Sequence, residues 1–267
     1  MELETWRILV LLFSSLFIGF IGGCVGMALG VVRVPIMTFL GVDPLVAAGS
    51  NLFISILGSI GALWPAFVEK RILWKIVILV GIPTFFGSFL GAYYASNFSQ
   101  WILLILIGTI LFLSAISIIL MSSFDLIVKE RKNRENLTYV KISKLGILRE
   151  GIIGGAIGFI GGAVGVALGV LRVPALVYIL KIHPRLSGGT NLAISIIMSL
   201  FGFMGHSISR NYDIGIIVIM GISAFIGMYF GSRFVGRFDP LKLRLGIGVI
   251  LLFVSPFVFY DAFSRIQ

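Results

Sequence analysis

The chain has little charge, and little of that charge is acidic. Its 267 residues include only 11 Asp and Glu residues, and charged residues of either sign make up 12%. A typical soluble domain carries about 25%. Hydrophobic residues reach 58%, and several windows of about 20 residues contain no charge, which predicts a polytopic helical membrane protein. The sequence lacks the alternating ten-residue segments that are typical of a membrane β-barrel.

Reactive and metal-binding residues are scarce as well. The single cysteine, Cys24, excludes an intrachain disulfide, and we expect it to be a small buried thiol. The two histidines, His183 and His206, have no neighbours at metal-ligand spacing; we expect surface residues, with proton coupling as the alternative. No phosphate-binding loop, nucleophile motif or catalytic dyad occurs, so we expect neither an enzyme nor a cofactor.

The formal net charge of +10 would suggest nucleic-acid binding in a soluble protein. Here the basic residues lie mainly between apolar runs, where they orient a membrane protein with its positive loops in the cytoplasm. We therefore expect a lipid bilayer and a small anionic substrate as partners, and no nucleic acid.

An internal duplication organises the chain. A glycine-rich stretch that ends in Arg-Val-Pro occurs at residues 22–35 and again at 161–174. The apolar runs of the second half repeat those of the first at a separation of 139 residues, and of 140 after one insertion. This pattern predicts two transmembrane repeats, 1–123 and 147–267, joined by a basic cytoplasmic linker at 124–146.

The distribution of basic residues favours inverted over parallel repeats. With the linker in the cytoplasm, inverted repeats place nine of the other basic loop residues inside, and parallel repeats place six there. The nine are Lys70, Arg71, Lys75, Lys181, Arg185, Arg233, Arg237, Lys242 and Arg244. Arg7, Arg210 and Arg265 lie outside in the inverted arrangement. We therefore expect a multi-pass protein of the plasma membrane with both termini near the outer face.

The runs that open each repeat are short. Within 6–40, each run has about 15 residues, or roughly 22 Å of helix, against a hydrocarbon core of ~30 Å. We expect a broken or re-entrant helix pair there, followed by three spanning helices. The predicted fold class is thus all-α and polytopic, with two inverted repeats and about eight full spans, or eight to ten on a loose count.

Glycine breaks inside apolar sequence suggest a substrate site. Unwound backbone at membrane depth is tolerated only where it is buried in protein or lines a wet cavity. Its free amide groups, next to the start of a helix, can hold an anion. We assign to this site Gly22, Gly23, Gly26, Gly161, Gly162 and Gly165. The alternative is close helix packing through glycine.

Arg33 and Arg172 occupy equivalent positions after these glycines. An arginine at the centre of a membrane helix costs roughly 2.5–3.5 kcal/mol on insertion scales. No Asp or Glu lies in the predicted apolar interior, so a substrate anion is one candidate counter-ion. The alternative is that each arginine snorkels to an interface or caps backbone carbonyls.

Polar residues form one stripe on the helix expected after each Asp43-Pro44 or His183-Pro184 step. The stripes are Asn51, Ser55 and Ser59, and Asn191, Ser195 and Ser199. Inverted symmetry would bring the two asparagines, with Ser50 and Thr190, to the midplane beside the glycine breaks. There we expect them to donate hydrogen bonds to the substrate. Helix–helix packing is the alternative for the serines.

Two Gly-x3-Gly patterns predict close helix packing, either within one protomer or between the protomers of a homodimer. They are Gly87-x3-Gly91 and Gly227-x3-Gly231.

The two copies resemble the sulfite exporter TauE/SafE family of membrane permeases. The family's Gly-x-Gly-Gly-Gly…Val-Pro stretch corresponds to 26–35 and 165–174, and its Gly-Thr-Ser-Leu-like segment to 49–52 and 189–192. Alanine and leucine replace the middle glycines, and asparagine stands where the family often has serine. The resemblance implies transport, commonly export, of sulfite, sulfonates, sulfoacetate or related organosulfur anions.

We therefore expect a secondary transporter that works by alternating access of the two repeats. A passive anion channel and a permease for a non-anionic solute are the alternatives.

Overall fold

The computed structural model describes residues 4–129, 144–180, 182–235, 237 and 240–265, and in these residues all regular secondary structure is helical. The first half contains α1 (Thr5–Val25), α2 (Gly30–Phe39), α3 (Pro44–Val68), α4 (Trp74–Tyr94), the 3-10 turn η1 (Ala95–Asn97) and α5 (Gln100–Lys129). The second contains α6 (Lys144–Ala163), α7 (Gly169–Pro174), the π-helical turn η2 (Ala175–Ile179), α8 (Pro184–Ile208), α9 (Ile214–Arg233) and α10 (Pro240–Ser264). The all-α prediction is confirmed.

Seven of the described helices are long and apolar enough to cross a membrane. One of them is α1, which has 21 residues and exceeds the run of about 15 that the sequence predicts. The helix continues through Gly22 and Gly23 because these glycines pack against neighbouring backbone, and it ends only at Gly26. Each half thus opens with one long helix followed by a short helical segment. In the first half these are α1 and α2, and in the second they are α6 and the continuous pair α7 and η2.

Helix starts follow the expected capping chemistry. The Asp43 carboxylate accepts a hydrogen bond from the backbone N–H of Leu45 (2.8 Å), with Pro44 as the first helical residue of α3. At the start of α9, the Asp213 carboxylate accepts from the N–H of Ile216 (3.0 Å). These caps satisfy amide groups that a helix leaves without an intrahelical partner, so they define where the spans begin.

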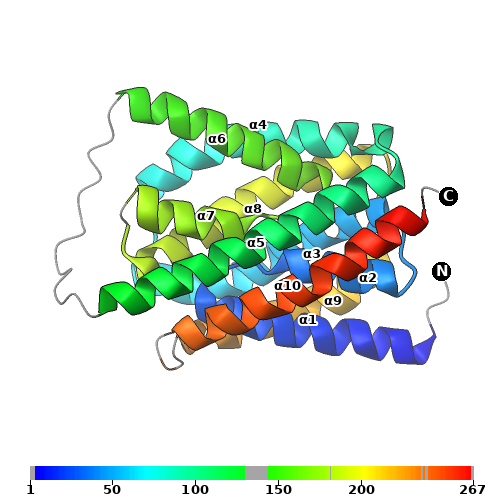
Figure 1. The fold of residues 1–267 in the computed structure, drawn as a ribbon, viewed down its shortest axis with the longest axis horizontal. Helices are drawn as coiled ribbons and strands as arrows, with labels where there is room; N and C mark the ends of the chain where they lie inside the picture. Colours follow the sequence, from blue (N-terminus) through cyan, green and yellow to red (C-terminus); the bar gives the residue numbers. More distant parts are fainter. Residues whose placement is uncertain (1–3, 130–143, 181, 236, 238–239, 266–267) are drawn as a thin grey trace.

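The two halves enter the bundle from opposite ends. In Figure 1, α1 begins and α10 ends at one end, while α5 ends and α6 begins at the other. Side chains join the segments at the first end: Arg7 Nη1 donates to the carbonyl of Leu40 (3.3 Å), and Arg265 Nη1 donates to Gln100 Oε1 (3.1 Å). α5 continues to Lys129, into the predicted linker at 124–146, and residues 130–143 of that linker lie outside the described residues.

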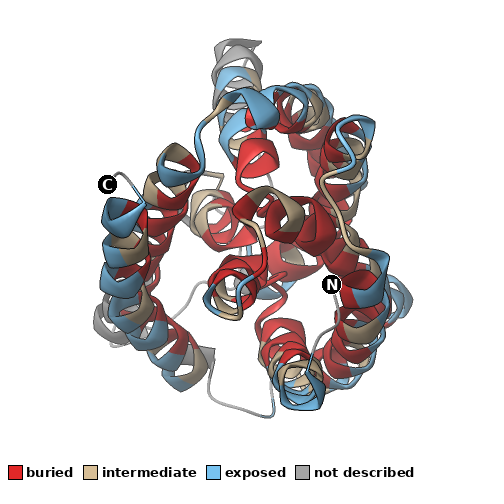
Figure 2. Ribbon diagram, turned by 90° about the vertical axis from the view of Figure 1, so that its right-hand side faces the viewer, coloured by how far each residue is buried: buried red, intermediate tan, exposed pale blue. Residues whose placement is uncertain are grey.

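The halves interlock, and they are not two separate bodies. α1 packs against α9 of the other half, and α6 packs in the same way against α4. α3 and α8 contact each other. In addition, α3 packs against α9, α8 packs against α4, and α5 packs against α10. Each contact has its counterpart when the halves are exchanged. Viewed along the bundle (Figure 2), buried residues face the inside and exposed residues face outward.

The Gly-x3-Gly patterns pack helices within this single chain. A Cβ at Gly91 would lie 1.9 Å from the carbonyl oxygen of Phe159 in α6, and one at Gly231 would lie 2.0 Å from that of Phe20 in α1. No side chain fits at these distances, so the glycines permit the α4–α6 and α9–α1 contacts. The homodimer remains a prediction.

Candidate functional site

Two breaks in the helices meet at the centre of the protein. The first break (Gly26–Leu29) follows α1, and Gly26 has a φ of 72°. The second break (Gly165–Leu168) follows α6, and Gly165 has a φ of 71°. Glycine adopts this left-handed conformation without the steric cost of a side chain, which is why the helices end there.

The amide groups where α1 and α6 end are already used by the backbone. Met27 N–H donates to the carbonyl of Gly22 (2.9 Å), and Val166 N–H donates to that of Gly161 (2.7 Å). Gly26 and Gly165 donate back to Gly23 and Gly162, both at 3.3 Å. The six glycines assigned to an anion cradle therefore do not present free amide groups in this conformation. Four of them lie inside α1 and α6 and serve packing, and Gly26 and Gly165 end the helices.

The asparagines tie each half to the break of the other half. Asn51 Nδ2 donates to the carbonyl of Gly165 (2.7 Å) across the halves and to that of Gly30 (3.3 Å) in its own. Asn191 Nδ2 donates to the carbonyl of Gly26 (3.3 Å). Both asparagines are fully buried. The structure thus brings Asn51 and Asn191 to the breaks, as the sequence predicts.

Arg33 and Arg172 lie in this same buried centre. Arg33 is 0% exposed and Arg172 is 3% exposed, so neither reaches an interface. Arg33 Nη1 donates to Asn51 Oδ1 (3.4 Å), and Arg172 Nη2 donates to the carbonyl of Ala167 in the second break (2.5 Å). Arg172 thus caps a backbone carbonyl, which is one of the two alternatives that the sequence leaves open. Neither arginine snorkels to a membrane interface.

Both guanidinium groups keep unused donors. Arg33 Nε and Nη2 and Arg172 Nη1 have no hydrogen-bond partner among the described residues. Neither arginine forms an ion pair with a carboxylate in the described part of the chain. A buried charge of this kind is stable only when a counter-charge or further acceptors complete its shell. The arrangement therefore has the chemistry of an anion site.

The two halves differ at their arginines. Asn51 Oδ1 accepts from Arg33, whereas Asn191 Oδ1 has no partner among the described residues. Arg172 instead contacts the sulfur of Met198 (3.1 Å). The first half has Gly58 at the position equivalent to Met198. This methionine is a site residue that the sequence reasoning missed, and comparison of the two halves would have indicated it.

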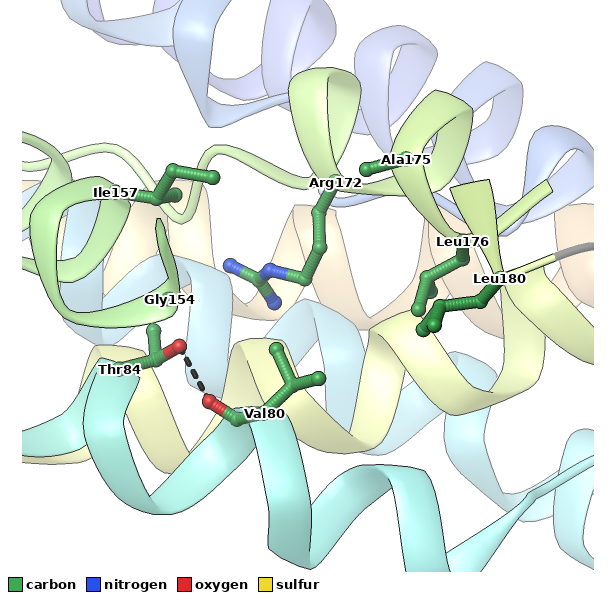
Figure 3. A pocket seen from close by; sticks show the side chains of 8 residues that line it. All are labelled: Val80, Thr84, Gly154, Ile157, Arg172, Ala175, Leu176 and Leu180. Atoms are coloured by element: carbon green, nitrogen blue, oxygen red, sulfur yellow. Dashed lines mark hydrogen bonds between the residues drawn. The ribbon is translucent and has the colours of Figure 1, made fainter. Parts of the chain in front are cut away.

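A small cavity lies beside Arg172, between α4, α6 and α7 (Figure 3). Its volume is about 20 Å³, and its lining includes Arg172, Thr84, Val80 and Gly154. The Arg172 guanidinium points toward Thr84 and Val80 in this view. Thr84 is a second residue that the sequence reasoning missed; the equivalent residue in the other half is Ala224.

Ser50 and Thr190 have structural partners. Ser50 Oγ accepts from the backbone N–H of Asp213 (2.9 Å), and Thr190 Oγ1 accepts from that of Leu73 (3.0 Å). These symmetric bonds hold the loops that precede α9 and α4. We therefore leave both hydroxyls out of the proposed anion site.

Replacing these hydroxyls should affect stability and not anion affinity. Ser50→Ala and Thr190→Val each leave one loop amide unpaired, at a cost of about 1 kcal/mol. Thermal unfolding of the purified protein in detergent, combined with anion titration, measures both effects. A loss of anion affinity at unchanged stability would return the hydroxyls to the site.

The remaining polar residues of the two stripes are buried. Ser55, Ser59, Ser195 and Ser199 are each 0% exposed, and their hydroxyls have no partner among the described residues. Serine in a helix ordinarily bonds the carbonyl one turn back, and these do not. They line the faces of α3 and α8 that carry Asn51 and Asn191.

The histidines differ in environment. His206 is fully buried, with Nε2 3.0 Å from the carbonyl oxygen of Gly162, so the prediction of a surface residue is wrong for it. It lies near the end of α8, between Gly162 of α6 and Gly49 of α3. His183 is exposed, and its Nδ1 accepts from the N–H of Arg185 (3.3 Å) at the start of α8.

An ion cluster joins the two halves at the end of the bundle opposite to the start of α1. Glu69 Oε2 lies 3.1 Å from Arg71 Nε and 2.7 Å from Arg185 Nη2. Burial lowers the pKa of Arg71, the charge of Glu69 opposes that effect, and the charge of Arg185 adds to it. Glu69 follows α3 and Arg185 lies in α8, so the cluster links the halves across this face.

Comparison with known proteins agrees with this architecture. The family described as sulfite exporter TauE/SafE matches residues 11–257. The probable membrane transporter protein YdhB of Bacillus subtilis is 30% identical over 92% of this chain and 99% of its own length. YunE of the same organism, also a probable membrane transporter protein, is 23% identical over 94% and 97%. No solved structure matches. The chain therefore belongs to the sulfite exporter TauE/SafE family of membrane transporters.

Proposed function

We propose that the protein is a secondary transporter of small anions, and that Arg33 and Arg172 bind the anion at the centre of the membrane. The observation that carries this proposal is the pair of fully buried guanidinium groups with unused donors and no carboxylate partner. An anion would complete the hydrogen bonding of both groups and neutralise their charge.

Sulfite, sulfonates, sulfoacetate and related organosulfur anions are the substrates that fit best. They present several oxygen acceptors around one centre, which suits the fork of N–H donors of arginine. The family description names a sulfite exporter, which supports the same class.

Alternating access of two inverted repeats is the mechanism that we infer. Each break is held by an asparagine of the other half, so a rocking motion of one half changes the surroundings of both arginines. The ion cluster around Glu69 is a contact that opening on that face would separate. We place this face and the segment between α5 and α6 in the cytoplasm of the cell, because basic residues dominate there.

The closed centre supports a transporter more than an open channel. Arg33 has no exposed surface, and the cavity beside Arg172 is too small for a whole sulfite ion. Substrate binding therefore requires a conformational change that widens the site, which is the behaviour of a gated carrier.

Arg33→Gln and Arg172→Gln should each weaken anion binding. Loss of hydrogen bonds from a charged donor costs about 1.5–3 kcal/mol, or roughly 10- to 150-fold in affinity. The test is titration of sulfite and a sulfonate against purified protein, with anion flux into liposomes as the second readout. Arg237→Gln, at an exposed arginine, is the control. Wild-type binding and flux in both site variants would contradict the proposal.

A further inference from the structure

The residues that line the cavity beside Arg172 differ from their equivalents around Arg33. Around Arg33, Ser15 of the first half stands in place of Gly154, and Met220 of the second half stands in place of Val80. Both side chains are larger, and Ser15 Oγ donates to the carbonyl of Met220 (2.7 Å), which holds it in the space that Gly154 leaves open. The pseudo-symmetry of the two halves is therefore broken at this cavity.

The cavity lies at the middle of the membrane-spanning part. Thr84 is ten residues from either end of α4, which runs from Trp74 to Tyr94. At 1.5 Å per residue, it is roughly 15 Å from both ends of the helix. A group in the cavity is thus equally distant from the two faces, as expected for a substrate site in an inverted-repeat carrier.

The lining offers a charged donor and one hydroxyl on an otherwise apolar wall. The Arg172 guanidinium points into the cavity, and its Nη1 has no partner among the described residues. Thr84 Oγ1 donates to the carbonyl of Val80 (2.6 Å), a bond within its own helix that a rotation of the hydroxyl hydrogen can exchange for another acceptor. Ile157, Leu176 and Leu180 make up much of the remaining wall.

The size of the cavity restricts what it can hold. A volume of about 20 Å³ admits one atom of the size of a water molecule. An apolar wall with a guanidinium and a hydroxyl favours an atom with negative charge over a neutral one, because the charge of Arg172 is otherwise uncompensated.

We propose that this cavity is an anion subsite in which a single negatively charged atom accepts hydrogen bonds from Arg172 and Thr84. The inference rests on the proposed function. The atom is either one oxygen of the transported oxyanion or a chloride ion, and the two sources share this chemistry. The anion is then held more firmly beside Arg172 than beside Arg33, and the two arginines are unequal in binding.

Thr84→Val tests the subsite, because it removes the hydroxyl and keeps the shape of the side chain. Hydrogen bonds to a charged group predict a loss of roughly tenfold or more in anion affinity. Thr109→Val is the matched control, since Thr109 Oγ1 also donates to the carbonyl four residues back (2.8 Å) and faces outward. The control should leave affinity unchanged.

Gly154→Ala tests the same subsite by filling it. The added Cβ would lie 3.1 Å from Thr84 Oγ1 and 3.3 Å from the carbonyl oxygen of Val80. Gly151→Ala, one turn earlier in α6, places its Cβ at an ordinary 3.7 Å from Pro83 and is the matched control. Thermal unfolding of each variant shows whether it is folded.

Titrations in gluconate buffer without chloride distinguish the two sources. If an oxyanion oxygen occupies the cavity, Thr84→Val and Gly154→Ala weaken binding of sulfite and a sulfonate. If chloride occupies it, the same variants weaken chloride binding and leave sulfite affinity as it is. Either result supports the subsite.

Unchanged affinity for all three anions in both folded variants would overturn the subsite. If Arg172→Gln still lowers affinity in that case, the proposed function stands without the subsite. If the unaltered protein binds none of these anions, the proposed function and the subsite fail together.

Discussion

Asn51→Ala should destabilise the protein by about 2–4 kcal/mol, whereas Asn191→Ala should cost only about 1 kcal/mol. The two asparagines occupy equivalent positions, but their environments differ. Asn51 bonds the carbonyls of Gly165 and Gly30 and accepts from Arg33, so its removal breaks three hydrogen bonds of buried groups. Asn191 has one bond, to the carbonyl of Gly26, and its Oδ1 has no partner among the described residues.

Thermal unfolding of the two variants in the same detergent measures this difference directly. Asn211→Ala is the control, because Asn211 lies at the end of the bundle and its Nδ2 donates to Ser96 Oγ (2.9 Å). Equal destabilisation by Asn51→Ala and Asn191→Ala would show that the halves are equivalent at the centre. The difference in hydrogen bonding between Asn51 and Asn191 would then be absent in solution.

Gly165→Ala should prevent recovery of folded protein. Gly165 has a φ of 71°, where an L-residue costs roughly 1–2 kcal/mol. Its Cβ would also lie 2.2 Å from Ala48 Cα in α3, so the second break would have to move away from the other half. We expect a total loss of at least about 4 kcal/mol, a large fraction of the stability of a typical domain.

Gly246→Ala is the control for this prediction. A Cβ at Gly246 meets nothing within 4 Å, so this substitution in α10 should not destabilise the protein, and the higher helix propensity of alanine should add up to about 1 kcal/mol. Expression level and the elution profile in detergent report on folding in both variants. A Gly165→Ala protein that elutes and transports like the unaltered chain would show that the contact with α3 is not required.

Much of the fold follows from local patterns. The apolar runs predict the long helices, the Asp43-Pro44 step predicts the start of α3, and the glycine-rich stretches predict a break after α1 and another after α6. These features depend on hydropathy, capping and backbone conformation, all of which a short segment carries with it. The length of α1 was underestimated: Gly22 packs against the backbone of Met27 in the following break and Gly23 against Met228 of α9, and these contacts lie outside the local pattern.

The duplication also carried information about the site. It predicts that Asn51 and Asn191 approach the breaks, and the bonds to Gly165 and Gly26 agree with that. It does not distinguish Ser50 and Thr190 from the asparagines beside them. The hydroxyls of Ser50 and Thr190 accept from the loop amides of Asp213 and Leu73, which are far away in the sequence.

By itself, the sequence determined the helical membrane class and the repeat. Each of these follows from composition or from self-similarity along the chain. Only the tertiary structure decided which donors of Arg33 and Arg172 are free, and that a cavity opens beside Arg172 and Thr84. Hydrogen-bond partners and packing volume depend on side chains from opposite halves of the protein, and no local pattern contains them.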